Sequence, residues 1–245
     1  ITNLAPFSFF NGFGTNPPSV GFSPALSGRT GLPKDTLINI EQTKEFTISI
    51  VTSKIIEQVS LSSCEFSDKI DEFVKAGFTK LDSEIISVPG VLESPFVMEC
   101  KLHKIIELGG KPASGNLILG EVVLFHVHES ILDISGKIDP LKIDQVGRSG
   151  GAWYTELKQS LFEINKPKGI GIGFDNLPGF ILKTDLTGKD LAKLAGVTSV
   201  PTITDENKNI NVSFDECIKI VKKMLAGNKI NQAWQLLLNW KKNND

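Results

Sequence analysis

The sequence predicts a mainly β domain with short helices, followed by a C-terminal extension that is largely helical. Between residues 1 and 165, apolar residues fall in short runs bounded by turn residues, which is typical of strands. After residue 170, apolar residues recur at helical spacing behind residues that commonly cap helices. We therefore expect one domain over residues 1–168 and an extension over 169–245 that packs on it or on a second copy of the chain.

Strand patterns are clearest in two long segments of the first domain. Phe96 to Leu108 alternates apolar residues with mainly polar ones, so we expect one face of this strand to be exposed to solvent. Leu117 to Val127 is apolar on both faces, as in a strand covered on both sides in the middle of a sheet. Two shorter strands are expected over 20–23 and 46–51, and turns over 16–18 and 88–90.

Two short helices are expected to interrupt these strands. Asp35 is a candidate N-cap for a helix over 36–42. Ser67 is a candidate N-cap for a helix over 68–76, which Gly77 would end.

The extension carries stronger helix signals. Thr187 is a candidate N-cap for a helix over 188–195, and Ser213 with Glu216 forms a capping box for a helix over 215–226. The last helix has an apolar stripe that must be buried against another surface. The stripe consists of Ile230, Ala233, Trp234, Leu237 and Leu238.

Composition and charge exclude several classes of function. The chain has 26 Lys and Arg against 28 Asp and Glu, so it has no basic surplus and we expect no nucleic-acid partner. No apolar run approaches the roughly 18 residues of a membrane helix, so we expect no membrane association. The three cysteines are widely spaced and odd in number, which favours a reducing cytoplasm over a disulfide framework.

The three histidines do not form a metal-binding pattern. His126 and His128 would share one face of a strand, but a third ligand is missing, because His103 lies among charged residues and is expected to be exposed. We therefore assign no metal site. His126 follows apolar residues on its own face, so it is either a satisfied core residue or a site residue.

The segment from Ser27 to Thr36 is a candidate anion site. It brings Arg29, Lys34 and the Thr36 hydroxyl to the start of a helix, where backbone N–H groups and the helix dipole favour a phosphate. The alternative is an ordinary capped helix with solvated basic residues.

The segment from Arg148 to Tyr154 is a second candidate site. Its paired glycines allow close approach of a ligand or of another backbone segment. A tight turn explains the same residues equally well.

Taken together, these segments resemble the flavin reductase family with an FMN-binding split barrel, which includes flavoredoxin-like members. The resemblance follows the order of the chain through 3–10, 16–18, 34–36, 39–40, 45–46, 93–95, 120–123, 126, 148, 150–151 and 154. It implies a split β-barrel that binds FMN, with FAD as the alternative flavin, and NAD(P)H as co-substrate. The activity it implies is transfer of a hydride from NAD(P)H to the flavin.

The resemblance also implies roles for individual residues. The flavin ring would contact Asn3, Ala5, Pro6, Phe7 and Ser8. The ribityl chain and phosphate would contact Ser23, Arg29, Lys34, Asp35 and Thr36. Arg148 and Tyr154 would close the site, and His126 would be the catalytic residue, near the flavin and the nicotinamide.

Family resemblance further implies partners and leaves alternatives open. Members usually form homodimers, and a flavin-dependent oxygenase or a redox protein is a possible partner. Members normally have a strand before the segment at Asn3, so we expect that this chain lacks its first strand and that something precedes Ile1. One alternative is an FMN-binding electron carrier without nicotinamide turnover, and another is a relative that has lost flavin.

Overall fold

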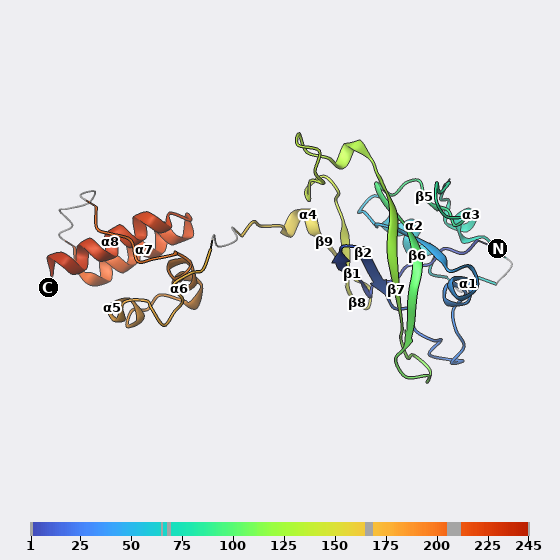
Figure 1. The fold of residues 1–245 in the computed structure, drawn as a ribbon, viewed down its shortest axis with the longest axis horizontal. Helices are drawn as coiled ribbons and strands as arrows, with labels where there is room; N and C mark the ends of the chain where they lie inside the picture. The colour runs from blue at the N-terminus through green and yellow to red at the C-terminus, as the bar shows by residue number, and fades with distance from the viewer. Residues whose placement is uncertain (1, 65, 68–69, 165–168, 205–211, 245) are drawn as a thin grey trace. The chain divides into compact units, whose positions relative to one another are not determined.

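The computed structural model describes residues 2–64, 66–67, 70–164, 169–204 and 212–244. The chain divides into two compact units, Ile1–Phe162 and Glu163–Asp245. Figure 1 shows the elements of both units.

The first unit is built on a five-stranded antiparallel sheet with the order β1-β2-β7-β6-β3. Its longest strands, β6 (Phe96–Glu107) and β7 (Asn116–Val127), run side by side through the unit (Figure 1). The other strands of this sheet are β1 (Phe10–Thr15), β2 (Pro18–Phe22) and β3 (Glu45–Ser49).

Short elements complete this unit. Two small sheets are formed by β4 (Lys80–Leu81) with β5 (Gly90–Val91), and by β8 (Val146–Gly150) with β9 (Trp153–Glu156). The helices are α1 (Asp35–Thr43), α2 (Ile56–Leu61), α3 (Glu72–Ala76), α4 (Leu157–Ser160) and the 3-10 turn η1 (Glu129–Ile131).

The core of the first unit lies between α1 and one face of the sheet. Ile40 of α1 packs in the same cluster as Phe46, Cys100 and Ile118, which come from three adjacent strands. At Gly120 a Cβ would lie 2.4 Å from Cζ of Phe46. Glycine is therefore required at this position, because its lack of a side chain lets the Phe46 ring lie directly on β7.

The four expected strands are confirmed, but two expectations about their faces are wrong. β7 lies at the centre of the sheet as expected, yet Phe125 on one of its faces is 45% exposed, so that face is not fully covered. In β6 the face expected to be exposed to solvent is buried at its first two positions, where Val97 and Glu99 are 1% and 0% exposed. The cover comes from residues 84–91, a segment distant in sequence that a local pattern does not reveal.

The two short helices begin at other residues than expected. Asp35 is the first residue of α1 and not its cap, because Lys34 occupies the N-cap position. α3 begins at Glu72, and its cap is Asp71, whose carboxylate accepts a hydrogen bond from Phe73 N–H. Ser67 is therefore not its cap, although Gly77 ends the helix as expected, and residues 68 and 69 lie outside the described part.

The second unit is helical, as predicted. It contains α5 (Gly179–Leu182), α6 (Gly188–Ala195), α7 (Phe214–Ala226) and α8 (Ile230–Asn243). Both expected N-caps are confirmed: Thr187 caps α6, where it forms a capping box with Asp190, and the Ser213 side chain accepts a hydrogen bond from Glu216 N–H at α7. The capping box expected at α7 is only half formed, because no bond from the Ser213 N–H to the Glu216 side chain is present there.

A hydrophobic core of its own stabilises the second unit. Ala233, Trp234 and Leu237 of the predicted stripe are fully buried in it, and the Trp234 indole donates to the carbonyl of Leu194. No helix among the described residues combines the length and the apolar character needed to cross a membrane.

The burial of the cysteines gives a prediction about thiol chemistry. Burial raises the pKa of Cys100 to about 12 and that of Cys217 to about 11, whereas Cys64 is exposed. Because the thiolate is the reactive form, we expect Cys64 alone to react rapidly with a disulfide reagent in the native protein. Titration of thiols with and without denaturant measures this. Cys64→Ser is the control, and rapid reaction of this variant would contradict the expectation.

Candidate functional site

A pocket of about 780 Å³ lies within the first unit. Five parts of the chain form its walls: the segment 2–8, α1, β3, α2 and the residues around 87–91. The hairpin of β8 and β9 contributes a further wall through residues 146–148 and Tyr154. A volume of this size is within the range of roughly 300–1,000 Å³ that is usual for cofactor and ligand sites.

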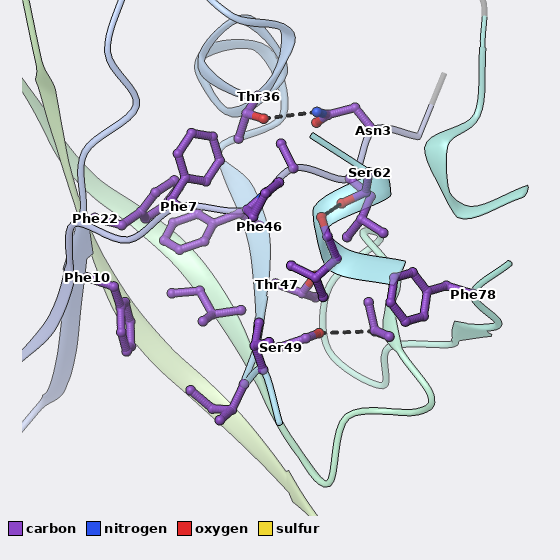
Figure 2. Close-up of a pocket in the computed structure, with 18 of the residues that line it drawn as sticks. Asn3, Phe7, Phe10, Phe22, Thr36, Phe46, Thr47, Ser49, Ser62 and Phe78 are labelled. Carbon is purple, nitrogen blue, oxygen red and sulfur yellow. Dashed lines mark hydrogen bonds between the residues drawn. The ribbon is translucent and has the colours of Figure 1, made fainter. Parts of the chain in front are cut away.

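One side of the pocket is aromatic. The rings of Phe7, Phe22 and Phe46 form a continuous cluster, with centroids 5.2 Å apart for the first pair and 5.4 Å for the second (Figure 2). The Lys34 ammonium lies 5.7 Å from the centre of the Phe7 ring, which places a positive charge beside this cluster. A flat aromatic ligand would find a matching apolar surface here.

A second side is polar and lies at the start of α1. The side-chain amide of Asn3 donates to the Thr36 hydroxyl oxygen at 2.9 Å (Figure 2), and the amide of Asn39 donates to Oδ1 of Asn3 at 3.3 Å. Lys34, at the N-cap position, has no side-chain hydrogen bond to the described first turn of α1. No side chain at the N-cap position therefore occupies the backbone N–H groups of that turn, and these groups and the positive end of the helix dipole favour an anion.

The segment that carries Asn3 is held from outside the pocket. The backbone N–H of Leu4 donates to Oε2 of Glu72 at 3.1 Å, and Glu72 is buried at the start of α3. This contact fixes an extended stretch that no strand pairing holds within the described residues.

A further wall is formed by polar residues of β3. Glu45, Thr47 and Ser49 alternate along the strand and bond to the chain between residues 87 and 91. The N–H and hydroxyl of Ser87 both donate to Glu45, and these bonds hold the pKa of Glu45 below its usual value. An ionised carboxylate therefore sits at this wall.

Arg148 and Tyr154 lie opposite each other on β8 and β9. The Arg148 guanidinium stacks 5.4 Å from the centre of the Tyr154 ring and donates to the carbonyl of Gly151. Both side chains are exposed where they line the pocket, so they are accessible to a ligand.

Comparison with known proteins identifies the family. The model of the family described as flavin reductase like domain matches residues 2–141. The chain belongs to the flavin reductase-like family. The predicted resemblance and the split-barrel fold are thus confirmed, and the matched range contains most of the pocket.

Three relatives illustrate the similarity. An uncharacterised protein of Aquifex aeolicus is 34% identical over 156 residues, 64% of this chain and 77% of its own length. Nitrilotriacetate monooxygenase component B from Bacillus cereus is 32% identical, with a TM-score of 0.60 over 67% of this chain and 79% of that one. A split-barrel protein from Shewanella frigidimarina is 27% identical, with a TM-score of 0.57 over 67% and 77%.

The structure of this flavin reductase-like chain brings eight of the residues named from sequence to one pocket. These are Asn3, Ala5, Pro6, Phe7, Ser8, Thr36, Arg148 and Tyr154. They come from the N-terminal segment, the start of α1 and the β8–β9 hairpin.

Five other named residues do not line the pocket. Arg29, Lys34 and Asp35 are exposed in the loop before α1 and at its first residue, next to Thr36 in the chain. Ser23 follows β2, where its backbone N–H donates to the carbonyl of Phe9. His126 lies near the end of β7.

His126 is paired with the buried Glu99. Its Nε2 lies 2.7 Å from Oε1 of Glu99, and its side chain is one-fifth exposed. Burial alone would raise the pKa of Glu99, but hydrogen bonds from Glu84 N–H, His126 and two further N–H groups outweigh burial and lower it. Because an ionised carboxylate only accepts, Nε2 carries the hydrogen and Nδ1 is left for any other contact. The catalytic role of His126 stays a prediction.

Several pocket and support residues were missed from sequence. Asn39, Glu45, Thr47 and Ser49 line the pocket, and Glu99 stands behind its wall. The alternation of polar residues at 45, 47 and 49 was a usable signal, because such a strand presents one polar face. Glu99 gave no comparable signal, since it resembled an exposed polar residue.

Proposed function

We propose that this protein is a flavin reductase that binds FMN or FAD and transfers a hydride from NAD(P)H to the flavin. The observation that carries the proposal is the pocket. It joins an aromatic cluster to the polar start of a helix within the residues that match the flavin reductase-like family.

The residues of the pocket fit the two ends of FMN. Phe7, Phe22 and Phe46 offer an apolar surface for the flavin ring, beside polar atoms of Asn3. The phosphate would be held by the first turn of α1 and the hydroxyl of Thr36, with Lys34 and Arg29 adding positive charge from the same loop. Ser23 and Asp35 belong to the same proposed set.

The chain's contribution to the reaction is positioning. When bound, the flavin supplies the chemistry by accepting a hydride from the nicotinamide. The aromatic cluster and the N-terminal segment would orient the flavin and exclude water, and Arg148 and Tyr154 would close the open side. None of these roles requires a covalent catalyst.

The visible spectrum of the purified protein tests this function. After addition of FMN and removal of the excess, we expect flavin absorption bands to remain and to bleach when NADH or NADPH is added. Bands that survive both nucleotides but bleach with dithionite would instead support the electron carrier. Absence of retained flavin together with absence of NAD(P)H oxidation in the presence of free FMN or FAD would contradict the proposal.

We also propose a homodimer in a reducing cytoplasm. Phe9 and Phe13, at 74% and 60% exposure, give the first unit apolar surface suited to a second copy. Light scattering of the purified full chain would measure its mass, and a monomer at micromolar concentration would contradict the dimer.

A flavin-dependent oxygenase is the second partner that we propose. The relative from Bacillus cereus is described as component B of a monooxygenase, which supports this partner.

A further inference from the structure

The buried carboxylate of Glu99 is not explained by the function proposed above. Glu99 lies on β6 with no exposed surface, and it does not line the pocket. It accepts four hydrogen bonds: from the backbone N–H groups of Glu84 at 2.7 Å, Ile85 at 2.8 Å and Ile86 at 3.1 Å, and from His126 at 2.7 Å. A buried carboxylate is costly unless donors satisfy its oxygens, and these four donors do so.

Three of these donors are consecutive N–H groups at one end of the 84–91 segment. The other end of this segment forms a wall of the pocket through residues 87–89 and 91. Within the pocket end, Gly90 lies so close to β6 that a Cβ would be 2.6 Å from Cγ1 of Val97. The segment is therefore seated directly on the strand that carries Glu99.

The bonds at the two ends of the segment differ in strength. Toward the pocket, the N–H and hydroxyl of Ser87 donate to the partly exposed carboxylate of Glu45 at 2.9 and 2.7 Å. Two bonds between neutral groups lie beside them: Thr47 donates to the Pro89 carbonyl at 2.8 Å, and Val91 N–H donates to Ser49 at 3.1 Å. At the other end, Glu99 provides charge-assisted bonds in a site without water access, which are the stronger kind. Loss of the Glu99 charge would weaken three backbone anchors at once.

We propose that Glu99 is a positioning residue for the pocket. Its carboxylate holds the 84–91 segment in place as a wall of the ligand site, and His126 supports the wall by donating to Glu99. The ligand named in the test, FMN, rests on the proposed function, but the contacts of Glu99 do not.

The first test compares two Glu→Gln substitutions on β6. Glu99→Gln keeps the volume of the side chain but places an amide N–H₂ against groups that are all donors. Glu107→Gln is the control, because Glu107 is exposed on the same strand. In the flavin-free full chain we expect hydrogen exchange to become about tenfold faster at residues 84–86 in Glu99→Gln only. We also expect FMN to bind about tenfold more weakly to that variant, with Glu107→Gln unchanged.

The second test asks whether His126 acts through Glu99. In His126→Gln the amide nitrogen can replace Nε2 as the donor to Glu99, whereas His126→Leu removes the donor. We expect His126→Gln to keep the protection of residues 84–86 and the FMN affinity, and His126→Leu to lose both. These variants also keep the proposal testable if Glu99→Gln does not fold.

The outcomes separate this inference from the proposed function. Unchanged exchange and unchanged FMN affinity in Glu99→Gln would overturn the inference, as would faster exchange with unchanged affinity, which would make Glu99 a stabilising residue only. Equal losses in His126→Gln and His126→Leu would overturn the role of His126 through Glu99. Failure of the wild-type protein to bind flavin would overturn the proposed function. Even then, faster hydrogen exchange at residues 84–86 in Glu99→Gln would support the conclusion that Glu99 holds the 84–91 segment in place.

Discussion

Replacement of Lys34 and Arg29 by alanine together is expected to weaken FMN binding by at least about a hundredfold. Each charge-assisted hydrogen bond to the phosphate contributes about 1.5–3 kcal/mol, so loss of two would cost about 3–6 kcal/mol. Both residues precede α1, and Thr36 in the first turn of this helix lines the pocket. Titration of the full chain with FMN measures the dissociation constant, with the quenching of flavin fluorescence as the signal.

A matched lysine separates phosphate binding from a general loss of charge. Lys104 is exposed on β6 and does not line the pocket, so Lys104→Ala should leave the FMN affinity unchanged. Riboflavin, which lacks the phosphate, should bind the double variant and the wild type equally. An FMN affinity equal to that of the wild type in the double variant would remove Lys34 and Arg29 from the proposed phosphate site.

Trp234→Ala is expected to destabilise the second unit by about 3–5 kcal/mol, which is the usual cost of removing a large buried aromatic side chain. Trp234 is fully buried, and its indole N–H satisfies the carbonyl of Leu194 at 3.2 Å. A small domain has a total stability of about 5–15 kcal/mol, so the loss is a large part of it. Hydrogen exchange of α7 and α8, with β6 and β7 measured in the same sample, reports the two units separately.

An exposed tryptophan provides the control for this substitution. Trp153 is 78% exposed, so Trp153→Ala should change stability by no more than about 0.5 kcal/mol. The described core around Trp234 is built from residues of the second unit alone, so we expect exchange in β6 and β7 to stay unchanged in Trp234→Ala. Equal acceleration in both units would contradict the expectation that they have separate cores.

Local sequence patterns predicted the elements whose structure is determined by local chemistry. The alternation in β6, the apolar run in β7 and the capped starts of α6 and α7 were readable, because each reflects backbone geometry within a few residues. The residues of the β8–β9 hairpin predict either a ligand loop or a tight turn, because their glycines permit both. The N-cap expected at Ser67 is wrong, because Ser67 and Asp71 are both capable of capping and local sequence does not distinguish them, whereas in the structure Asp71 accepts the bond from Phe73 N–H.

Sequence patterns alone predicted the family resemblance, four strands of the large sheet, the helical extension and the segments that supply most of the pocket. Only the tertiary structure decided that Asn3 meets Thr36 and Asn39, that Glu99 is buried, and that His126 is its partner. The physical reason is the range of the interactions. Periodicity and capping record the average burial and backbone conformation of neighbouring residues, whereas these contacts join segments that meet only when the whole unit packs.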